Sequence, residues 1–274
     1  VDSMALFGPQ ALLGLPAQVT FLPTRIYSAI SSYPPRWSEA SSLSLILVVL
    51  TALGLYAQHY YLNKRSFVTV SGKGVRPALA ELGIWTWPLL AFCFLVVLLS
   101  AILPLGVLIY AAFSKSWTAG LSWSNLTFDN IRDALIDNQT AHRGIVNSFR
   151  LAAVAALVAS TIGLAIAYID LRTTLRGRRL LDYLAILPLG LPGTVMAVGM
   201  ILAFIRPPVV IYGTIWILLV AYIARFLPLA TRTANSTLRQ IDPSLEEAAR
   251  ITGATWLGSI RSILFPLAAP GLVT

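Results

Sequence analysis

The chain has 274 residues, of which 57% are hydrophobic and 11% are charged, whereas an ordinary soluble domain is about 25% charged. A soluble fold of this length could not bury so much apolar surface, so the composition predicts a protein that is surrounded by lipid. The formal charge of +9 does not indicate a nucleic-acid-binding protein, because the Lys and Arg residues form short runs between long apolar stretches.

The first forty residues are apolar but rich in glycine and proline. Irregular backbone is not tolerated where it faces lipid, so we expect residues 5–40 to lie outside the bilayer or to pack as re-entrant structure. The chain begins Val1-Asp2-Ser3, without an initiator Met or the basic start of a signal peptide, and it ends inside an apolar run. Both ends look cut, and we expect a fragment of a longer chain.

Five later stretches are long and apolar enough for spanning helices, each of which needs about 20 apolar residues. They are residues 40–62, 82–113, 151–169, 183–205 and 207–224, and a sixth begins near Ser262 and is interrupted by the end of the chain. We therefore expect an all-α membrane protein, a polytopic helical bundle.

The basic residues predict which side of the membrane each loop faces. They lie between the first and second stretches, between the third and fourth, and after the fifth: Lys64, Arg65, Lys73, Arg76, Arg172, Arg176, Arg178, Arg179, Arg225, Arg232, Arg239, Arg250 and Arg261. The positive-inside rule places these alternate loops on the cytoplasmic side. Asp170 and Asp182 lie at the same ends of the spans, where we expect ion pairs with Arg172, Arg178 or Arg179.

Two prolines and two glycines interrupt the fourth stretch in Pro188-Leu189-Gly190-Leu191-Pro192-Gly193. Each proline removes a backbone hydrogen bond, and glycine permits close approach of helices. In transporters such broken helices occur where substrate passes, but a packing kink would have the same pattern. Candidates for lining a passage, with core packing as the alternative reading, are Pro188, Gly190, Pro192, Gly193, Tyr110, Asn147, Tyr168 and Tyr212.

The segment after the fifth stretch, residues 231–266, predicts two helices joined by a turn. Asp242-Pro243 is a favourable helix start, since Asp can cap free N–H groups and Pro suits the first helical position. Gly253 marks the end of this helix, and a second helical pattern leads to Pro266.

The same segment contains Glu247-Ala248-Ala249, three residues, Gly253, nine residues, Ile263, and then Phe265-Pro266. This spacing resembles the EAA loop of binding-protein-dependent ABC importer permeases, although that family usually has Leu before the proline. The resemblance implies a type I importer permease, whose loop forms a short coupling helix that docks on an ATP-binding subunit. It implies a role in ATPase coupling for Glu246, Glu247, Ala248, Ala249, Gly253, Ala254, Trp256, Ile263 and Pro266.

The layout of the whole chain is similar to fused two-half permeases of the ferric-iron uptake type, with Asn147-Ser148-Phe149 leading into the third span. Residues 1–62 would then end a first permease half, 63–81 would be a cytoplasmic linker, and 82–274 would form most of a second half. The resemblance implies a bacterial inner-membrane protein with a dimer of ABC ATP-binding subunits and a periplasmic substrate-binding protein as partners. It implies ferric iron as cargo, with polyamines, thiamine and aminoethylphosphonate as alternatives.

No catalytic set, bound cofactor or metal site is predicted for the chain itself. Ser71-Gly72-Lys73-Gly74 lacks the first glycine of a phosphate loop and has Gly74 where Ser or Thr should hold magnesium. ATP and Mg²⁺ are therefore expected on the partner ATPase. Cys93 is the only cysteine, and His59 and His142 belong to no ligand-spaced motif.

Two other classes of protein share some of these features with an importer permease. An ion-coupled secondary transporter or channel would also have a broken span, but it would more often carry ionisable groups inside the membrane. A membrane-embedded enzyme would need a convergent acid, base or nucleophile set, which the sequence lacks.

Overall fold

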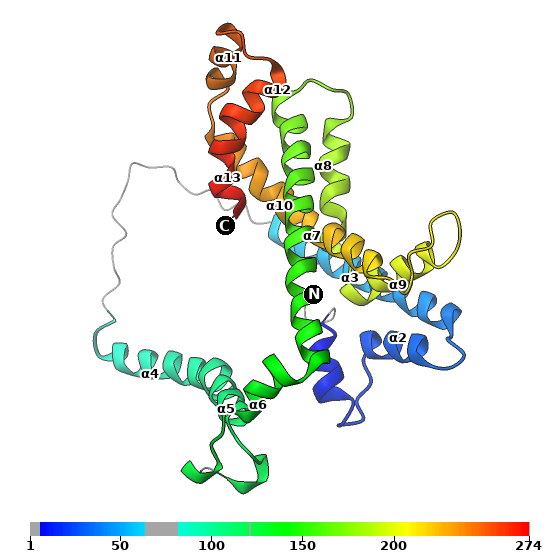
Figure 1. The fold of residues 1–274 in the computed structure, drawn as a ribbon, viewed down its shortest axis with the longest axis vertical. Helices are drawn as coiled ribbons and strands as arrows, with labels where there is room; N and C mark the ends of the chain where they lie inside the picture. The colour runs from blue at the N-terminus through cyan, green and yellow to red at the C-terminus, as the bar shows by residue number, and fades with distance from the viewer. Residues whose placement is uncertain (1–5, 64–81, 121, 274) are drawn as a thin grey trace. The chain divides into compact units, whose positions relative to one another are not determined.

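The computed structural model describes residues 6–63, 82–120 and 122–273 (Figure 1). The described residues form helices and turns, with one isolated antiparallel bridge between Ser114 and Leu126, so the all-α expectation is confirmed. Besides short 3₁₀ and π turns, the α-helices of the described residues are α2 (Leu22–Ser31), α3 (Trp37–Asn63), α4 (Thr86–Val97), α5 (Leu103–Ala112), α6 (Asp129–Arg132), α7 (Gln139–Arg172), α8 (Arg178–Ile186), α9 (Gly193–Phe204), α10 (Ile215–Gln240), α11 (Ser244–Ile251), α12 (Trp256–Ser259) and α13 (Phe265–Val273).

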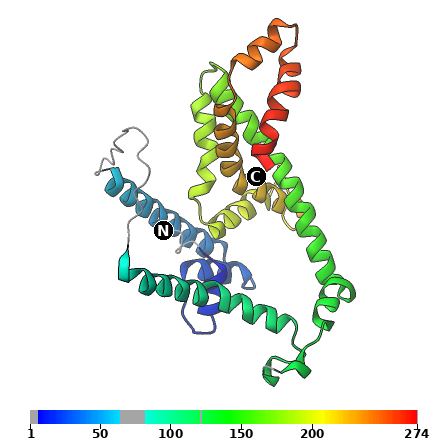
Figure 2. The ribbon, with the colours of Figure 1, turned by 90° about the vertical axis from the view of Figure 1, so that its left-hand side faces the viewer.

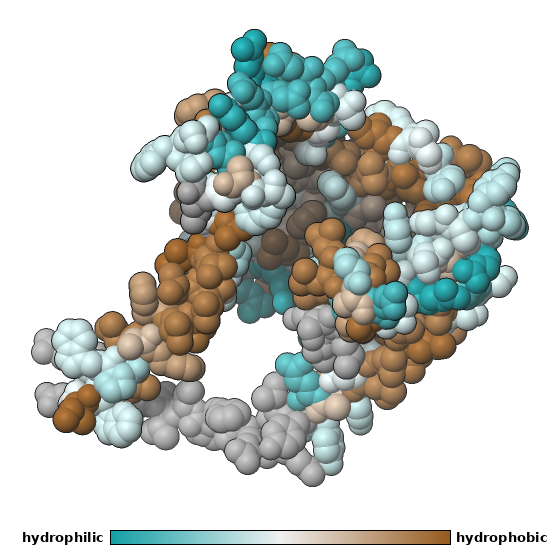
Figure 3. Space-filling model, turned by 90° about the horizontal axis from the view of Figure 1, so that it is seen from below, coloured by the Kyte–Doolittle hydropathy of each residue, from teal (hydrophilic) through white to brown (hydrophobic). Residues whose placement is uncertain are grey.

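Four helical runs in the described residues are long and apolar enough to cross a bilayer. They are Trp37–Gln58, Gly83–Ala112, Gln139–Arg172 and Ile215–Gln240, and the bent pair Arg178–Gly190 with Gly193–Phe204 counts as a fifth if it is one span. In Gly83–Ala112, none of the most apolar window is buried within the chain. Figure 3 shows large hydrophobic areas on the visible face, as expected of helices that contact lipid or other subunits.

The fifth apolar stretch was placed wrongly at 207–224. Residues 205–214 form turns, and α10 begins at Ile215 and continues to Gln240. Pro207 and Pro208 lack the N–H groups that a helix interior needs, and Gly213 has a φ of +79°. Three arginines that the sequence placed in a loop lie within α10, namely Arg225, Arg232 and Arg239. Arg is strongly polar, but it is a good helix former, so the helix continues past the end of the apolar stretch.

The chain divides into two compact units, residues 1–66 with 150–274, and residues 67–149. The basic positions Lys64, Arg65, Lys73 and Arg76 and the linker 64–81 lie outside the described residues.

In the first unit, the glycine- and proline-rich N-terminal segment contains a helix that packs against the bundle. α2 contacts α3 and α9, and Ile26, Leu47 and Val198 form a small buried cluster between them. Glu39 at the start of α3 pairs with Arg25 at 2.6 Å and with Arg36 at 2.8 Å. The N-terminal segment is thus held against both α3 and the second half of the broken span.

Small residues bring α7 and α10 close together in the first unit. Buried Ala155, Ala159, Gly163 and Ala167 recur every four residues along α7 and therefore share one face. A Cβ atom added to Gly163 would lie 2.8 Å from the carbonyl carbon of Ala230. Farther along, a buried cluster joins α7, α10 and the residue after it, the π-helical segment before α13, and α13: Ala167, Ala234, Leu238, Ile241, Leu264 and Ala268. Figure 2 shows α13 beside α10.

In the second unit, the helical run Gly83–Ala112 leads into a loop that is organised around Asn125. The Asn125 Nδ2 group donates to the Ser116 carbonyl at 2.8 Å and to the Tyr110 hydroxyl at 3.1 Å. The Tyr110 hydroxyl also donates to the Gly120 carbonyl. Tyr110, a candidate for lining a passage, therefore has a local role in ordering this loop.

We expect Gly163→Leu to disrupt the contact between α7 and α10, because its side chain would collide with the backbone at Ala230. The free energy of unfolding should fall by about 1–3 kcal/mol, the usual cost of overpacking. Thermal unfolding of the purified protein in detergent measures the change. Gly144→Leu is the matched control on the same helix, since no described atom lies within 4 Å of its added Cβ. Equal losses in both variants would contradict the close packing.

Candidate functional site

The connection from α10 to α12 contains the two helices and the turn that the sequence pattern predicts. After α10 ends, the Asp242 carboxylate accepts a hydrogen bond of 2.9 Å from the Ser244 N–H, and α11 begins at Ser244. This hydrogen bond from the backbone lowers the pKa of the Asp242 carboxyl below its ordinary value. Gly253 follows α11 with a φ of +92°, a conformation that side chains disfavour, and α12 begins at Trp256.

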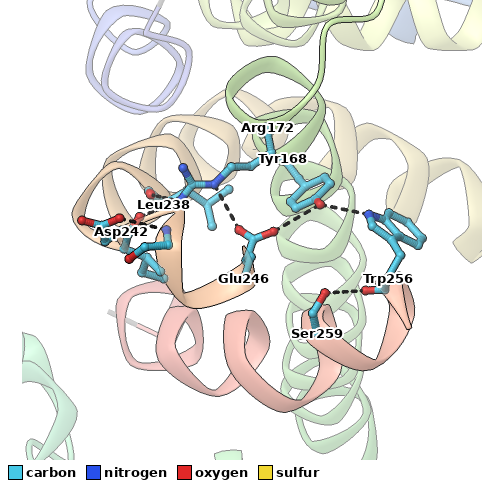
Figure 4. A network of polar contacts seen from close by, with 9 residues as sticks. Tyr168, Arg172, Leu238, Asp242, Glu246, Trp256 and Ser259 are labelled. Carbon is cyan, nitrogen blue, oxygen red and sulfur yellow. Dashed lines mark hydrogen bonds and ion pairs between the residues drawn. The ribbon is translucent and has the colours of Figure 1, made fainter. Parts of the chain in front are cut away.

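Arg172, in the last turn of α7, holds α10 and α11 together (Figure 4). Its Nη2 group donates to the Leu238 carbonyl at 3.2 Å and to the Ile241 carbonyl. Its Nε atom lies 3.1 Å from a carboxylate oxygen of Glu246, and both side chains of this ion pair are only 12% exposed. One guanidinium thus donates to free carbonyls at the C-terminal end of α10 and forms an ion pair with the acidic residue in the first turn of α11.

The ion pairs expected between Asp170 or Asp182 and Arg172, Arg178 or Arg179 are absent from the part of the chain that the structure describes. Within the described residues, Arg172 pairs with Glu246, and Arg178 donates to the Thr173 carbonyl. The Asp182 carboxylate instead accepts a hydrogen bond from Asn235 on α10, at 3.5 Å. Pairing between neighbours in the sequence was overridden by contacts that form only when α7, α8 and α10 pack together.

Tyr168 extends the same network to α12. It lies one turn before Arg172 on the same face of α7, and its hydroxyl donates to the second Glu246 oxygen at 3.3 Å. The Trp256 Nε1 group donates to the Tyr168 hydroxyl at 2.9 Å, and the two rings meet edge to face with centroids 6.0 Å apart. Tyr168, a candidate for lining a passage, therefore contacts the residues that follow α10.

The nine coupling candidates differ in exposure, and those on α11 lie on two opposite faces of the helix, the outer of which also includes Ile251. Glu246 and Ala249 face inward, where Ala249 is 8% exposed. Glu247, Ala248 and Ile251 share the opposite face and are exposed, Ile251 to 86%. We call these three residues the open face of α11. Among the other candidates, Ala254 and Ile263 are half-buried, and the exposed ones are Gly253, Trp256 and Pro266.

The broken span is the second place where the structure gathers predicted residues. Pro188 and Gly190 lie in a short 3₁₀ turn, Pro192 is buried, and Gly193 begins α9. The helices before and after this turn meet at 113°. Of the other candidates for a passage, Tyr212 is exposed in the turn before α10, and Asn147 is exposed in the part of α7 that belongs to the second unit.

Arg225 is a residue at this break that the sequence reasoning did not single out. Its Nη1 group, reaching from α10, donates to the Pro188 carbonyl at 3.4 Å and to the Leu191 carbonyl at 3.0 Å. Ending the apolar stretch at residue 224 placed Arg225 in a loop. The sequence did contain an indication of this contact, because a basic residue inside a helix that is otherwise suited to lipid requires a polar partner.

Comparison with known proteins identifies relatives over the whole chain. Residues 159–274 match the family described as binding-protein-dependent transport system inner membrane component. The chain is 32% identical to the ferric transport system permease protein FbpB of Actinobacillus pleuropneumoniae, over 100% of this chain and 39% of that protein. It is also 32% identical to the spermidine/putrescine transport system permease protein PotC of Haemophilus influenzae, over 63% of this chain and 65% of that protein.

A third relative is the sulfate transport system permease protein CysT of Salmonella typhimurium, which is 30% identical over 65% of this chain and 64% of that protein. The relatives matched along the entire chain are much longer, and the chain spans about two fifths of their length, 39% and 43%.

We expect Glu246→Gln to loosen α11, because the substitution removes the carboxylate that pairs with Arg172. The free energy of local opening should fall by about 1–3 kcal/mol, and amide hydrogen exchange in α11 should accelerate accordingly. Glu247→Gln is the matched control, since its side chain is exposed and its loss should cost less than about 0.5 kcal/mol. Equal exchange rates in the two variants, measured by mass spectrometry, would refute the anchoring role of Glu246.

Proposed function

This chain belongs to the family of binding-protein-dependent transport system inner membrane components, and from that premise we propose that it is part of the permease of an ABC importer, coupled to its ATPase through α11. The observation that carries the proposal is the division of α11 into two faces. Glu246 and Ala249 hold it against the bundle, while the open face presents Glu247, Ala248 and Ile251.

The chemistry of the open face suits docking on a partner protein. Ala248 keeps the helix surface thin, Ile251 offers apolar area, and Glu247 can pair with a basic residue of the partner. Glu247 also lies in the first turn of α11, where the helix dipole favours a negative charge.

The network behind α11 would allow a force applied to it to reach the membrane helices. Arg172 joins Glu246 to the end of α10 and is itself part of α7, and Trp256 joins α12 to Tyr168 on α7. Because these side chains are packed and paired, α11 would move with the ends of α7 and α10. Movement driven by ATP in the partner subunits would thus alter access through the spans.

In this proposal the ATPase partner is a dimer of ATP-binding subunits, which bind and hydrolyse ATP with Mg²⁺. The chain would lie in a bacterial inner membrane, where a periplasmic substrate-binding protein delivers the cargo. The family description and the permease relatives support this arrangement.

Ferric iron is the cargo that we propose. Its support is the ferric transport relative, which matches the entire chain at 32% identity. Shorter matches are named for spermidine/putrescine, 2-aminoethylphosphonate and sulfate transport, so polyamines, aminoethylphosphonate and sulfate are competing cargoes, together with thiamine from the sequence resemblance.

We expect Glu247→Lys together with Gly253→Val to uncouple the permease. The first change reverses the charge on the open face, and the second forces a β-branched residue into a φ of +92°. Binding of the ATPase subunits in a pull-down should weaken by about 10-fold or more, and ATP-dependent uptake should fall in parallel.

Gly106→Val together with Asp129→Lys is the control for these two changes. An added Cβ at Gly106 has no described atom within 4 Å, and Asp129 is an exposed acidic residue of the other unit. Membrane insertion should be unchanged in both double variants. Normal ATP-dependent uptake by the first double variant would contradict the coupling role of α11.

The cargo is tested with the full-length permease, its ATPase subunits and its binding protein in proteoliposomes. We expect ATP-dependent uptake of radioactive ferric iron that requires the binding protein. ATP-dependent uptake of spermidine, thiamine, 2-aminoethylphosphonate or sulfate without iron uptake would overturn the cargo. Uptake driven by an ion gradient in the absence of ATPase subunits would overturn the importer class.

A further inference from the structure

The break between α8 and α9 leaves backbone carbonyls without their normal helical donors. Pro192 has no N–H to donate to the Pro188 carbonyl four residues earlier. The Pro188 carbonyl accepts a tight-turn hydrogen bond of 3.3 Å from the Leu191 N–H, and α9 restarts with the Met196 N–H donating to the Pro192 carbonyl. The Leu191 carbonyl accepts neither of these two backbone hydrogen bonds. In a segment suited to lipid, such a carbonyl requires another donor.

Arg225 is that donor. One nitrogen of its guanidinium bridges the Leu191 carbonyl at 3.0 Å and the Pro188 carbonyl at 3.4 Å. Hydrogen bonds from a charged donor are roughly twice as strong as neutral ones. The positive charge also lies at the C-terminal end of the helical segment before the break, which the helix dipole makes negative. The bend is therefore held by a side chain of α10 and not by its own backbone alone.

The other end of α10 belongs to the network behind α11. Arg172 binds the Leu238 carbonyl and pairs with Glu246, so α10 and α11 are joined there. The helix runs from Arg225 to Leu238, a rise of about 20 Å at about 1.5 Å per residue, although Pro228 inside it removes one backbone hydrogen bond. Along this length Thr231, Ala234 and Leu238 are buried, which limits sideways movement of α10. α10 therefore connects the residues around α11 to the break in a neighbouring span.

We propose that Arg225 is a positioning residue through which displacement of α11 is passed along α10 to the break between α8 and α9. This inference rests on the proposed function, since it takes α11 as the element that the ATPase moves. α9 is held on its other side, where Val198 packs against Ile26 and Leu47. A shift of α10 then changes the angle at the Leu191 carbonyl while α9 stays fixed, and the bend opens or closes.

The test follows the reactivity of a cysteine at the break in the full-length permease with its ATPase subunits in nanodiscs. Leu189, which is 47% exposed in the turn, is replaced by Cys in a background that includes Cys93→Ser. Its rate of reaction with a maleimide is measured without nucleotide and with ATP trapped by vanadate. In this parent we expect the nucleotide to change the rate by about 5-fold or more, the lower range of allosteric coupling.

Arg225→Met removes both hydrogen bonds, and the two rates should then agree within about 2-fold, below the usual range of allosteric coupling. Arg225→Lys keeps the charge with a different donor geometry and should retain part of the response. Arg232→Met is the matched control, an exposed arginine on the same helix, and should respond like the parent. A purely structural role would shift the rate in both nucleotide states equally, whereas loss of transmission removes the difference between them.

A response of Arg225→Met equal to that of Arg232→Met would overturn the proposal. If Arg225→Met does not assemble, Arg225→Lys is compared with Arg232→Met instead. A smaller nucleotide response in Arg225→Lys supports the proposal, and an equal response overturns it. A parent that shows no nucleotide response would also overturn the proposal, because the break would then not move, whereas the coupling role of α11 is tested separately by uptake in the variant with Glu247→Lys and Gly253→Val. Failure of the proposed function is thus distinguished from failure of the inference about Arg225.

Discussion

A helix of eight residues, such as α11, is too short to keep its conformation or its direction without packing against other elements. The ion pair between Arg172 and Glu246 supplies that fixed direction. It is only 12% exposed on both sides, and the same guanidinium binds the last carbonyls of α10. Removing one partner of such a pair leaves a poorly solvated charge, so the interaction specifies one arrangement of α7, α10 and α11 more than it adds stability. The open face of α11 points away from the bundle because Glu246 points into it.

The packing of α7 on α10 makes this anchor effective. The hydrophobic effect contributes little to the association of helices that are surrounded by lipid, so their association depends on close contact of small residues. Gly163 and the alanines on its face of α7 allow the backbones to approach, and the buried cluster around Leu238 continues the contact as far as α13. A displacement of Arg172 therefore acts on α7 and α10, which are packed closely against each other. The bend between α8 and α9 differs in kind, because it is bonded to α10 through Arg225.

The sequence predicted the features that depend on composition and on local backbone chemistry. Apolar length located α3, the run Gly83–Ala112 and α7, although the helices extend beyond the apolar core where polar residues are still good helix formers. Asp242-Pro243 and Gly253 correctly marked the start and end of α11, because capping and a positive φ are local requirements. The fifth stretch was placed wrongly because hydropathy does not register that Pro207 and Pro208 prevent a helix from beginning before them, which is also a local requirement. The partners of Arg172 and Arg225 were beyond local reasoning, since Arg172 and Ile241 meet across 69 positions of sequence and Arg225 and Pro188 across 37. Likewise, the motif at Glu247 could not show that the neighbouring Glu246 is the buried acid, because that depends on how α11 is rotated on α7.

The central claim is that the open face of α11 is the surface that meets the ATPase subunit. Site-specific photo-crosslinking in the assembled full-length transporter tests it most directly, with the photoreactive residue placed in turn at Glu247, Ala248, Ile251 and the inward-facing Ala249. We expect crosslinks to the ATPase subunit from the first three positions and none from Ala249. Crosslinks of equal yield from Ala249, or none from any of the four positions, would contradict the claim.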